Sequence, residues 1–154
     1  MLLRTHFIFN FFIFLLLIKL NLLTFSFWIF LIFFLATCIP DIDVPGSFIS
    51  KRTKPLSNFI HIITGHREEF HSLLFSVSLS LIVLLIFRNI LFSGIFFLFY
   101  FLHLLLDSFT KSGIRWLWPS KFRIKGNITT GRFLESIVFL IFALASVILI
   151  LIMI

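Results

Sequence analysis

The stretch Phe133 to Ile154 reads FLESIVFLIFALASVILILIMI and contains one charged residue, Glu135. A helix needs about 20 consecutive apolar residues to cross the hydrocarbon core of a bilayer, so this stretch is long enough to span a membrane. A helix at the surface of a soluble domain would show polar residues on its outer face, and this one shows almost none. We therefore predict a membrane-spanning helix here.

The composition of the whole chain supports this prediction. Of the 154 residues, 60% are hydrophobic and only 12% are charged, and the mean hydropathy is +1.18. A soluble domain carries roughly a quarter of its residues as charged side chains. This chain lacks the polar residues needed to cover a water-facing surface, so lipid must be the solvent for most of it.

Four further apolar stretches lie upstream of the last one. They run from Thr5 to Leu20, Leu22 to Ile39, Ser72 to Phe87 and Ile90 to Leu106. The first two are separated only by the region around Asn21, and the next two only by Arg88 and Asn89, so each pair must form an antiparallel hairpin. We predict an all-α, polytopic membrane bundle of five spans: two hairpins and a C-terminal helix. It would be a single domain over residues 1–154 with polar loops at 40–71 and 107–132.

The N-terminal segment has the outline of a secretory signal, because Arg4 precedes an apolar run. No small-residue cleavage site follows before Lys19, and we expect the segment to be retained as a span. Cys38 is the only cysteine, which excludes an intrachain disulfide.

Counting crossings places the ionisable residues. If five spans alternate in direction, all acidic and all histidine residues fall on the side that holds Met1: Asp41, Asp43, Glu68, Glu69, Asp107, Glu135, His6, His61, His66, His71 and His103. Of the 13 Lys and Arg residues, only Lys19 and Arg88 fall on the other side. The positive-inside bias then places the N-terminus and both polar loops in the cytoplasm, in a cell (inner) membrane.

The net charge of +7 raises the alternative of nucleic-acid binding. The basic residues crowd into the two loops, as expected for topology and for attraction to anionic lipid headgroups, so we disfavour a nucleic-acid partner. Lys51, Arg52, Lys54, Lys121 and Arg123 are the candidates for headgroup attraction. Nothing in the sequence indicates an oligomeric state.

The pair His103 and Asp107 ends the fourth predicted span. Residues four apart lie on one face of a helix, so this imidazole and carboxylate can ligate one metal, or the carboxylate can orient the imidazole. The alternative is a hydrogen-bonded pair that only stabilises the bundle. Ionisable groups near hydrocarbon are costly and by default indicate function.

The segment from Gly65 to Ser72 contains His66 and His71. Five residues correspond to roughly 140° on an ideal helix, so the two rings share a site only if a helix starts within the segment. The alternative is a solvated loop with interfacial histidines.

Two more sets of candidate ligands complete the pattern. Asp41 and Asp43 follow Pro40 where the second span ends, and His6 starts the first span. Taken singly, these residues also suit a polar helix stop and an interfacial histidine. Together with the other motifs they bring His and Asp from distant segments to one membrane face, and these ligands suit zinc, with manganese or iron as alternatives.

These motifs, in this order, resemble the YdjM-like family of membrane-bound, metal-dependent hydrolases. The resemblance covers about two-thirds of the chain and rests on these motifs: Thr5-His6, Pro40-Asp41-Ile42-Asp43, His66-Arg67, His71-Ser72, His103 to Asp107, Thr110, Gly113 and Trp118-Pro119. The chain departs from the family pattern at Glu68, where the family has Gly, and at Phe70, where it has Thr. The final Pro-Phe of the pattern is lengthened to Pro119-Ser120-Lys121-Phe122.

The resemblance implies an activity. The family is similar to zinc-dependent phospholipase C and the P1-type nucleases, which implies hydrolysis of a phosphoester, such as a phospholipid, at the membrane surface. His66, His71, His103 and Asp107 would be the main metal ligands, with His6, Asp43 and Asp41 completing or orienting the set. Asp43 and Asp107 would also act in catalysis, and Arg67 would clamp a phosphate.

The rival interpretation is a membrane protein that binds metal without catalysis: a transporter, a sensor or an inert relative of the hydrolases. Transporters place polar ligands near the bilayer midplane. The middles of the predicted spans are almost free of polar groups, with Asn10 the main exception, and this argues against a transport pathway.

Overall fold

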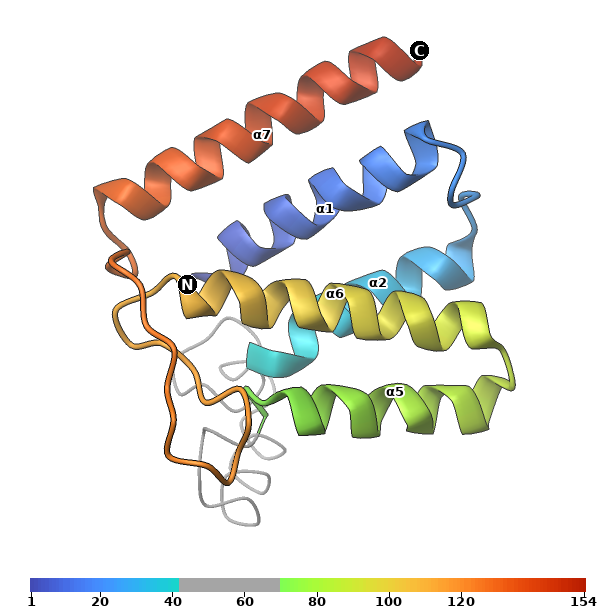
Figure 1. The fold of residues 1–154 in the computed structure, drawn as a ribbon. Coiled ribbons are helices and arrows are strands. Elements are labelled where there is room, and N and C mark those ends of the chain that lie inside the picture. Colours follow the sequence, from blue (N-terminus) through green and yellow to red (C-terminus); the bar gives the residue numbers. More distant parts are fainter. Residues whose placement is uncertain (42–69) are drawn as a thin grey trace, which may run out of the picture.

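The structure is a computed structural model that describes residues 1–41 and 70–154. In this part of the chain it contains five α-helices: α1 (Leu3–Lys19), α2 (Phe27–Cys38), α5 (Leu73–Phe87), α6 (Ile90–Ser108) and α7 (Phe133–Met153). A short 3-10 helix, η1 (Ile39–Asp41), extends α2. Each α-helix overlaps one predicted span, which confirms the all-helical bundle (Figure 1).

The link between α1 and α2 is longer than predicted. The second span was expected from Leu22, but α2 begins only at Phe27. The chain turns at Asn21, which has a positive φ of 56°, and the backbone N–H groups of Leu22 and Leu23 donate to the carbonyl of Leu17. Leu23 is buried in the core. Packing of this leucine over the end of the bundle favours a turn where the apolar sequence alone suggested helix.

The link between α5 and α6 is as short as predicted. Arg88 adopts a left-handed conformation, with φ 47° and ψ 34°, and ends α5. Asn89 caps α6, because its side chain accepts a hydrogen bond from the backbone N–H of Leu91. Two residues therefore reverse the chain and form the second hairpin.

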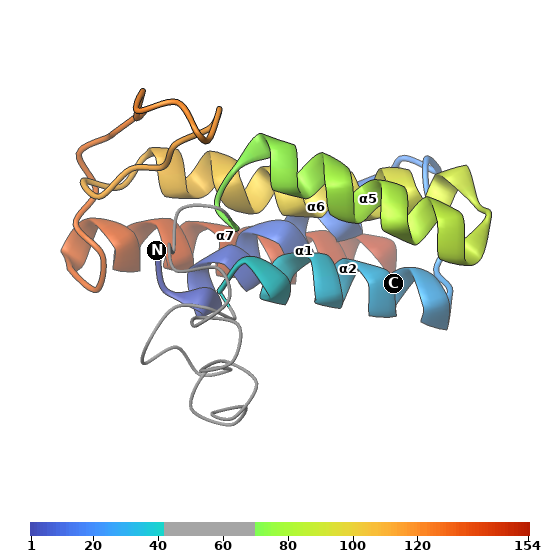
Figure 2. The same ribbon diagram turned by 90° about the horizontal axis from the view of Figure 1, so that it is seen from below.

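The order in which the helices pack side by side differs from their order along the chain. Helix α1 packs between α7 and α2, and α6 contacts α1, α2 and α5. Figure 2 shows α5 and α6 lying over α1 and α2. The outer faces of α5 and α7 expose large apolar side chains, among them Leu85 (76% exposed) and Leu151 (67%). Apolar surface on this scale is atypical of a soluble monomer and suits contact with lipid.

Two of the helices have the length and composition of a full membrane span, α6 with 19 residues and α7 with 21. Helix α1 has 17 residues, α2 has 12 and α5 has 15. Shorter helices are accommodated by local thinning of the bilayer or by flanking segments.

One polar group lies deep in the apolar core. Asn10, fully buried on α1, donates through Nδ2 to Thr37 Oγ1 and to the carbonyl of Phe99, both at 3.0 Å. This side chain therefore joins α1 to α2 and α6. It acts as a packing contact between these three helices.

The segment between α6 and α7 folds back over the end of the bundle. Thr110 contacts both Asp107 and Ser112, and its backbone carbonyl accepts from the N–H of Gly126. A Cβ atom at Gly126 would lie 2.2 Å from the carbonyl oxygen of Phe109, so only glycine allows this approach. We call residues 109–132 the covering loop. Figure 1 shows it as the orange trace at the end of the bundle where α7 begins.

Candidate metal centre

The predicted ligands that the structure describes lie at one end of the bundle. His6 comes from the first turns of α1, Asp41 from η1 after α2, and His71 from the residues before α5. His103 and Asp107 lie in the last turns of α6. Figure 1 shows that these helix ends meet beside the N-terminus. The antiparallel arrangement of the spans is what brings them together.

His103 is held with one ring nitrogen free for a ligand. It is fully buried, and its Nδ1 lies 3.0 Å from the carbonyl oxygen of Thr37. A carbonyl oxygen only accepts hydrogen bonds, so Nδ1 must carry the proton and donate it. In the neutral ring this leaves the lone pair on Nε2, which has no hydrogen-bond partner among the described residues. A backbone carbonyl that orients a histidine in this way is typical of metal sites.

The free nitrogen of His103 faces two carboxylates. Its Nε2 lies 3.8 Å from Asp41 Oδ1 and 3.8 Å from Asp107 Oδ2. The Nε2 of His71 lies 3.9 Å and 3.5 Å from the same two oxygens. His6 completes the group, with Nε2 at 3.1 Å from Asp107 Oδ1. The amino group of Met1 also forms an ion pair with Asp107.

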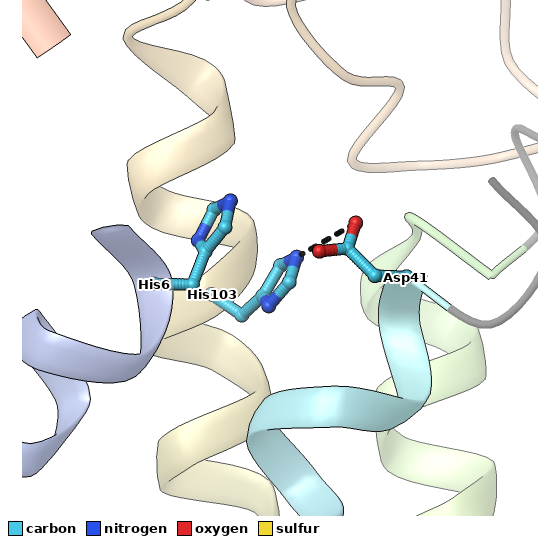
Figure 3. A group of neighbouring side chains, drawn as sticks. All are labelled: His6, Asp41 and His103. Carbon is cyan, nitrogen blue, oxygen red and sulfur yellow. Dashed lines mark ion pairs between the residues drawn. The ribbon is translucent and has the colours of Figure 1, made fainter. Parts of the chain in front are cut away.

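Two of the imidazole rings are stacked. The rings of His6 and His103 have centroids 3.7 Å apart and planes 4° from parallel. Figure 3 shows these rings side by side, with His103 facing the carboxylate of Asp41. Two positively charged rings would repel each other in this position. A cation bound by both rings would require the neutral imidazole, the form of histidine that ligates metals.

His71 is positioned by the backbone on both sides of it. The hydroxyl of Tyr100 donates to the carbonyl of Phe70 at 2.7 Å. Ser72 caps α5 by accepting from the N–H of Phe75, and the N–H of Leu73 donates to the carbonyl of Trp116. The imidazole is thus fixed between α6 and the covering loop.

These residues fit a divalent cation such as zinc. The donor atoms form two groups that share His103, one with His6 and Asp41 and one with His71 and Asp107, and within each group they lie within 4.8 Å of one another. Two ligands about 2.0 Å from one tetrahedral zinc are about 3.3 Å apart, so small side-chain movements would close this set around an ion. Nitrogen and oxygen donors without a thiolate suit zinc, manganese or iron.

The sequence predictions for this site have different outcomes. The structure brings together His6, Asp41, His71, His103 and Asp107. Asp43, His66 and Arg67 lie outside the described residues, so their roles stay predictions. Sequence spacing alone gave the weakest indication for His6, which the structure places beside Asp41 and His103.

Glu135 lies on the same membrane side but has a different role. Its carboxylate accepts hydrogen bonds from the N–H of Leu2, the hydroxyl of Thr5 and the N–H of Gly131. These donors leave it joined to α1 and the covering loop rather than facing the histidines. Counting crossings placed Glu135 on this side, but no local motif revealed that it ties α7 to α1.

A cavity of about 220 Å³ opens beside the ligand cluster. Asp41, His71 and Asp107 form one wall of it. Residues of the covering loop also line it, including Ser112, Gly113, Arg115, Arg123 and Thr130. A small molecule in this cavity would contact the candidate metal ligands directly.

Comparison with known proteins gives the family. The profile of the family described as YdjM inner membrane protein matches residues 1–154. The chain is 34% identical over 110 residues to the protein YvsG of Bacillus subtilis (strain 168), described as uncharacterized, covering 70% of this chain and 69% of that protein. It is 36% identical over 99 residues to the inner membrane protein YdjM of Escherichia coli (strain K12), covering 58% of this chain and 48% of that protein.

The inner membrane protein YdjM of Shigella flexneri matches to the same extent, so the chain spans about half the length of these two relatives. No solved structure matches the chain significantly. The family match and the helical bundle agree that this is an integral membrane protein with a lipid bilayer around it. The chain belongs to the YdjM family of inner membrane proteins.

Proposed function

We propose that this protein is a membrane-bound, metal-dependent hydrolase that acts on a phosphoester at the cytoplasmic face. The observation that carries the proposal is the burial of three histidines and two aspartates at the end of an otherwise apolar bundle: His6, His71, His103, Asp41 and Asp107. Burying so many ionisable groups is costly unless they are paired or coordinate a metal. A role in stabilising the bundle alone would need fewer buried ionisable side chains.

The residues have distinct parts in this proposal. His6, His71, His103, Asp41 and Asp107 would hold the cation, which Asp43 and His66 would complete. A bound divalent cation supplies an activated water and Lewis acidity toward a phosphoryl oxygen. The carbonyl of Thr37 keeps His103 in the ligating tautomer. Asp107 faces the cavity and can accept a proton from an attacking water, while Arg67 would bind a phosphate oxygen.

The position of the site at the membrane surface supports a lipid or lipid-like substrate. The ligands lie at helix ends beside a polar loop, where a phosphate headgroup lies when its acyl chains remain in the bilayer. The lysine and arginine bias favours the cytoplasmic side.

The proposal is tested by hydrolysis assays on the purified protein with zinc, manganese or iron added. The substrates are a panel of phospholipids, with phosphodiesters such as bis(p-nitrophenyl) phosphate for comparison. We expect turnover that Asp107→Asn lowers by at least about two orders of magnitude, because loss of a metal ligand or catalytic base has effects of this size.

The control variant is Lys125→Gln, which changes an exposed residue of the covering loop and is expected to keep full activity. Metal retention without turnover on any substrate would favour the rival interpretation, a metal-binding protein that is not an enzyme. Turnover that persists in Asp107→Asn would contradict the proposed site.

A further inference from the structure

Two arginines line the same cavity as the candidate metal ligands. Arg115 and Arg123 lie on the covering loop and are both partly buried, whereas the neighbouring Lys121 and Lys125 are exposed. The lining also includes the two carboxylates of the cluster, Asp41 and Asp107. One cavity therefore holds two guanidinium groups and the candidate cation ligands.

The backbone of the covering loop sets the two arginines side by side. Ile114 and Ile124 form an isolated antiparallel bridge, in which each N–H donates to the other carbonyl at 3.0 Å. In this register Arg115 lies opposite Arg123. The loop thus places two guanidinium groups close together on the lining of the cavity.

Gly113 makes this pairing possible. It has a φ of +61°, and a Cβ atom there would lie 2.2 Å from the carbonyl oxygen of Ile124. A side chain at this position would push the two strands apart. The glycine, the bridge and the two arginines therefore form one local unit.

The balance of charge in the cavity indicates what this unit binds. Met1 also lines the cavity, and its amino group pairs with Asp107. Three positive groups, on Met1, Arg115 and Arg123, therefore face the two carboxylates of Asp41 and Asp107. A divalent cation held by those carboxylates would increase this excess of positive charge, which an anionic ligand would offset. Arg123 also donates from Nη1 to the carbonyl of Ser112 at 2.9 Å, which holds its guanidinium in place.

We propose that Arg115 and Arg123 form a phosphate subsite that binds the phosphate group of the substrate beside the metal ligands. This inference rests on the proposed function. The planar guanidinium group matches phosphate with two parallel hydrogen bonds. The cavity of about 220 Å³ is smaller than typical small-molecule pockets of about 300–1,000 Å³. It therefore admits a phosphate with a small attached group, such as a lipid headgroup or a small soluble phosphoester.

The test is phosphate binding by the full-length protein in dodecyl maltoside micelles without phospholipid. Isothermal titration calorimetry with inorganic phosphate is performed with and without added zinc. We expect Arg115→Gln and Arg123→Gln each to weaken binding by about tenfold or more, because each removes charge-assisted hydrogen bonds. Zinc is expected to strengthen binding by the wild type.

Two further variants keep the result interpretable. Lys125→Gln removes an exposed positive charge of the same loop and is expected to bind phosphate like the wild type. Arg115→Lys keeps the charge but loses the planar fork, and we expect an affinity between those of the wild type and Arg115→Gln. Equal affinity in the arginine variants and in Lys125→Gln would overturn the subsite.

A second arm of the experiment identifies the source of the phosphate. If short-chain phosphatidic acid binds more tightly than inorganic phosphate, the subsite serves lipid headgroups. If the two bind with equal affinity, it serves soluble phosphoesters. Either result supports the subsite, provided that the arginine variants weaken binding. Zinc content is measured on the same samples. A protein that retains no zinc overturns the proposed function, while the comparison of arginine variants still decides the phosphate subsite.

Discussion

At the scale of single residues, His103 shows how a buried side chain is prepared as a ligand. Its ring is fully buried, where an unpaired polar nitrogen is costly. The carbonyl of Thr37 takes one nitrogen at 3.0 Å, and the other faces two carboxylates at 3.8 Å. A hydrogen-bonded pair that only stabilised the bundle would need one carboxylate. A bound cation would account for the second carboxylate and the two further histidines.

Glu135 is acidic, buried and at the same end of the bundle as the candidate metal ligands, but its carboxylate is hydrogen-bonded to other groups. It therefore allows a prediction about a single residue. Its two oxygens accept from Leu2, Thr5 and Gly131. In Glu135→Gln one of the oxygens becomes a donor, so at least one of these hydrogen bonds is lost. We expect the free energy of unfolding in detergent to fall by about 1–3 kcal/mol, with zinc content unchanged. Loss of zinc together with unchanged stability would contradict this role.

At the scale of elements, the covering loop depends on a few backbone contacts. Gly113 allows the close approach of Ile124, and Gly126 allows that of Phe109. The bridge between Ile114 and Ile124 then sets the register of the cavity wall. The loop thus positions its arginines without a long strand or a helix.

Replacing Gly113 by alanine tests this dependence. We expect Gly113→Ala to separate the two strands and to weaken phosphate binding about as much as loss of one arginine, with zinc content retained. Gly131→Ala is the matched control, because Gly131 also has a positive φ, +76°, but a Cβ there would meet nothing within 4 Å. Its expected effect is a destabilisation of about 1 kcal/mol and no change in phosphate affinity. Equal phosphate affinities in the two variants would contradict the role of Gly113.

The elements also show how far the sequence predicts this structure. Apolar length alone located all five helices, and the Arg88-Asn89 link alone located one hairpin, because these are local properties. The start of α2 was wrong by five residues, since burial of Leu23 is a tertiary effect. The pairing of Arg115 with Arg123 depends on a loop register, and spacing in the sequence does not encode it.

At the scale of the whole molecule, the direction of the spans decides whether a shared site exists. An antiparallel arrangement of α1, α2, α5 and α6 returns each ligand-bearing helix end to one end of the bundle (Figure 1). This part of the site was predictable, because counting crossings needs only the number of spans. The stacking of His6 on His103 was not, since it depends on how α1 packs against α6.

Cysteine labelling tests the arrangement of the spans across the membrane. In a Cys38→Ala background, Ser120→Cys probes the covering loop and Leu22→Cys the link between α1 and α2. We expect a membrane-impermeant maleimide to label Ser120→Cys only from the cytoplasmic side and Leu22→Cys only from the opposite side. Labelling of both from one side would contradict the proposed topology.

The central claim is that the histidines and aspartates at one end of the bundle hold a divalent cation. Its most direct test is the zinc content of the untagged protein after purification and dialysis, measured by mass spectrometry. We expect at least about one zinc per chain in the wild type and in Glu135→Gln, since a set of His and Asp donors binds zinc tightly. We expect almost no zinc in the folded His71→Ala, His103→Ala double variant. Equal zinc content in the wild type and the double variant would contradict it.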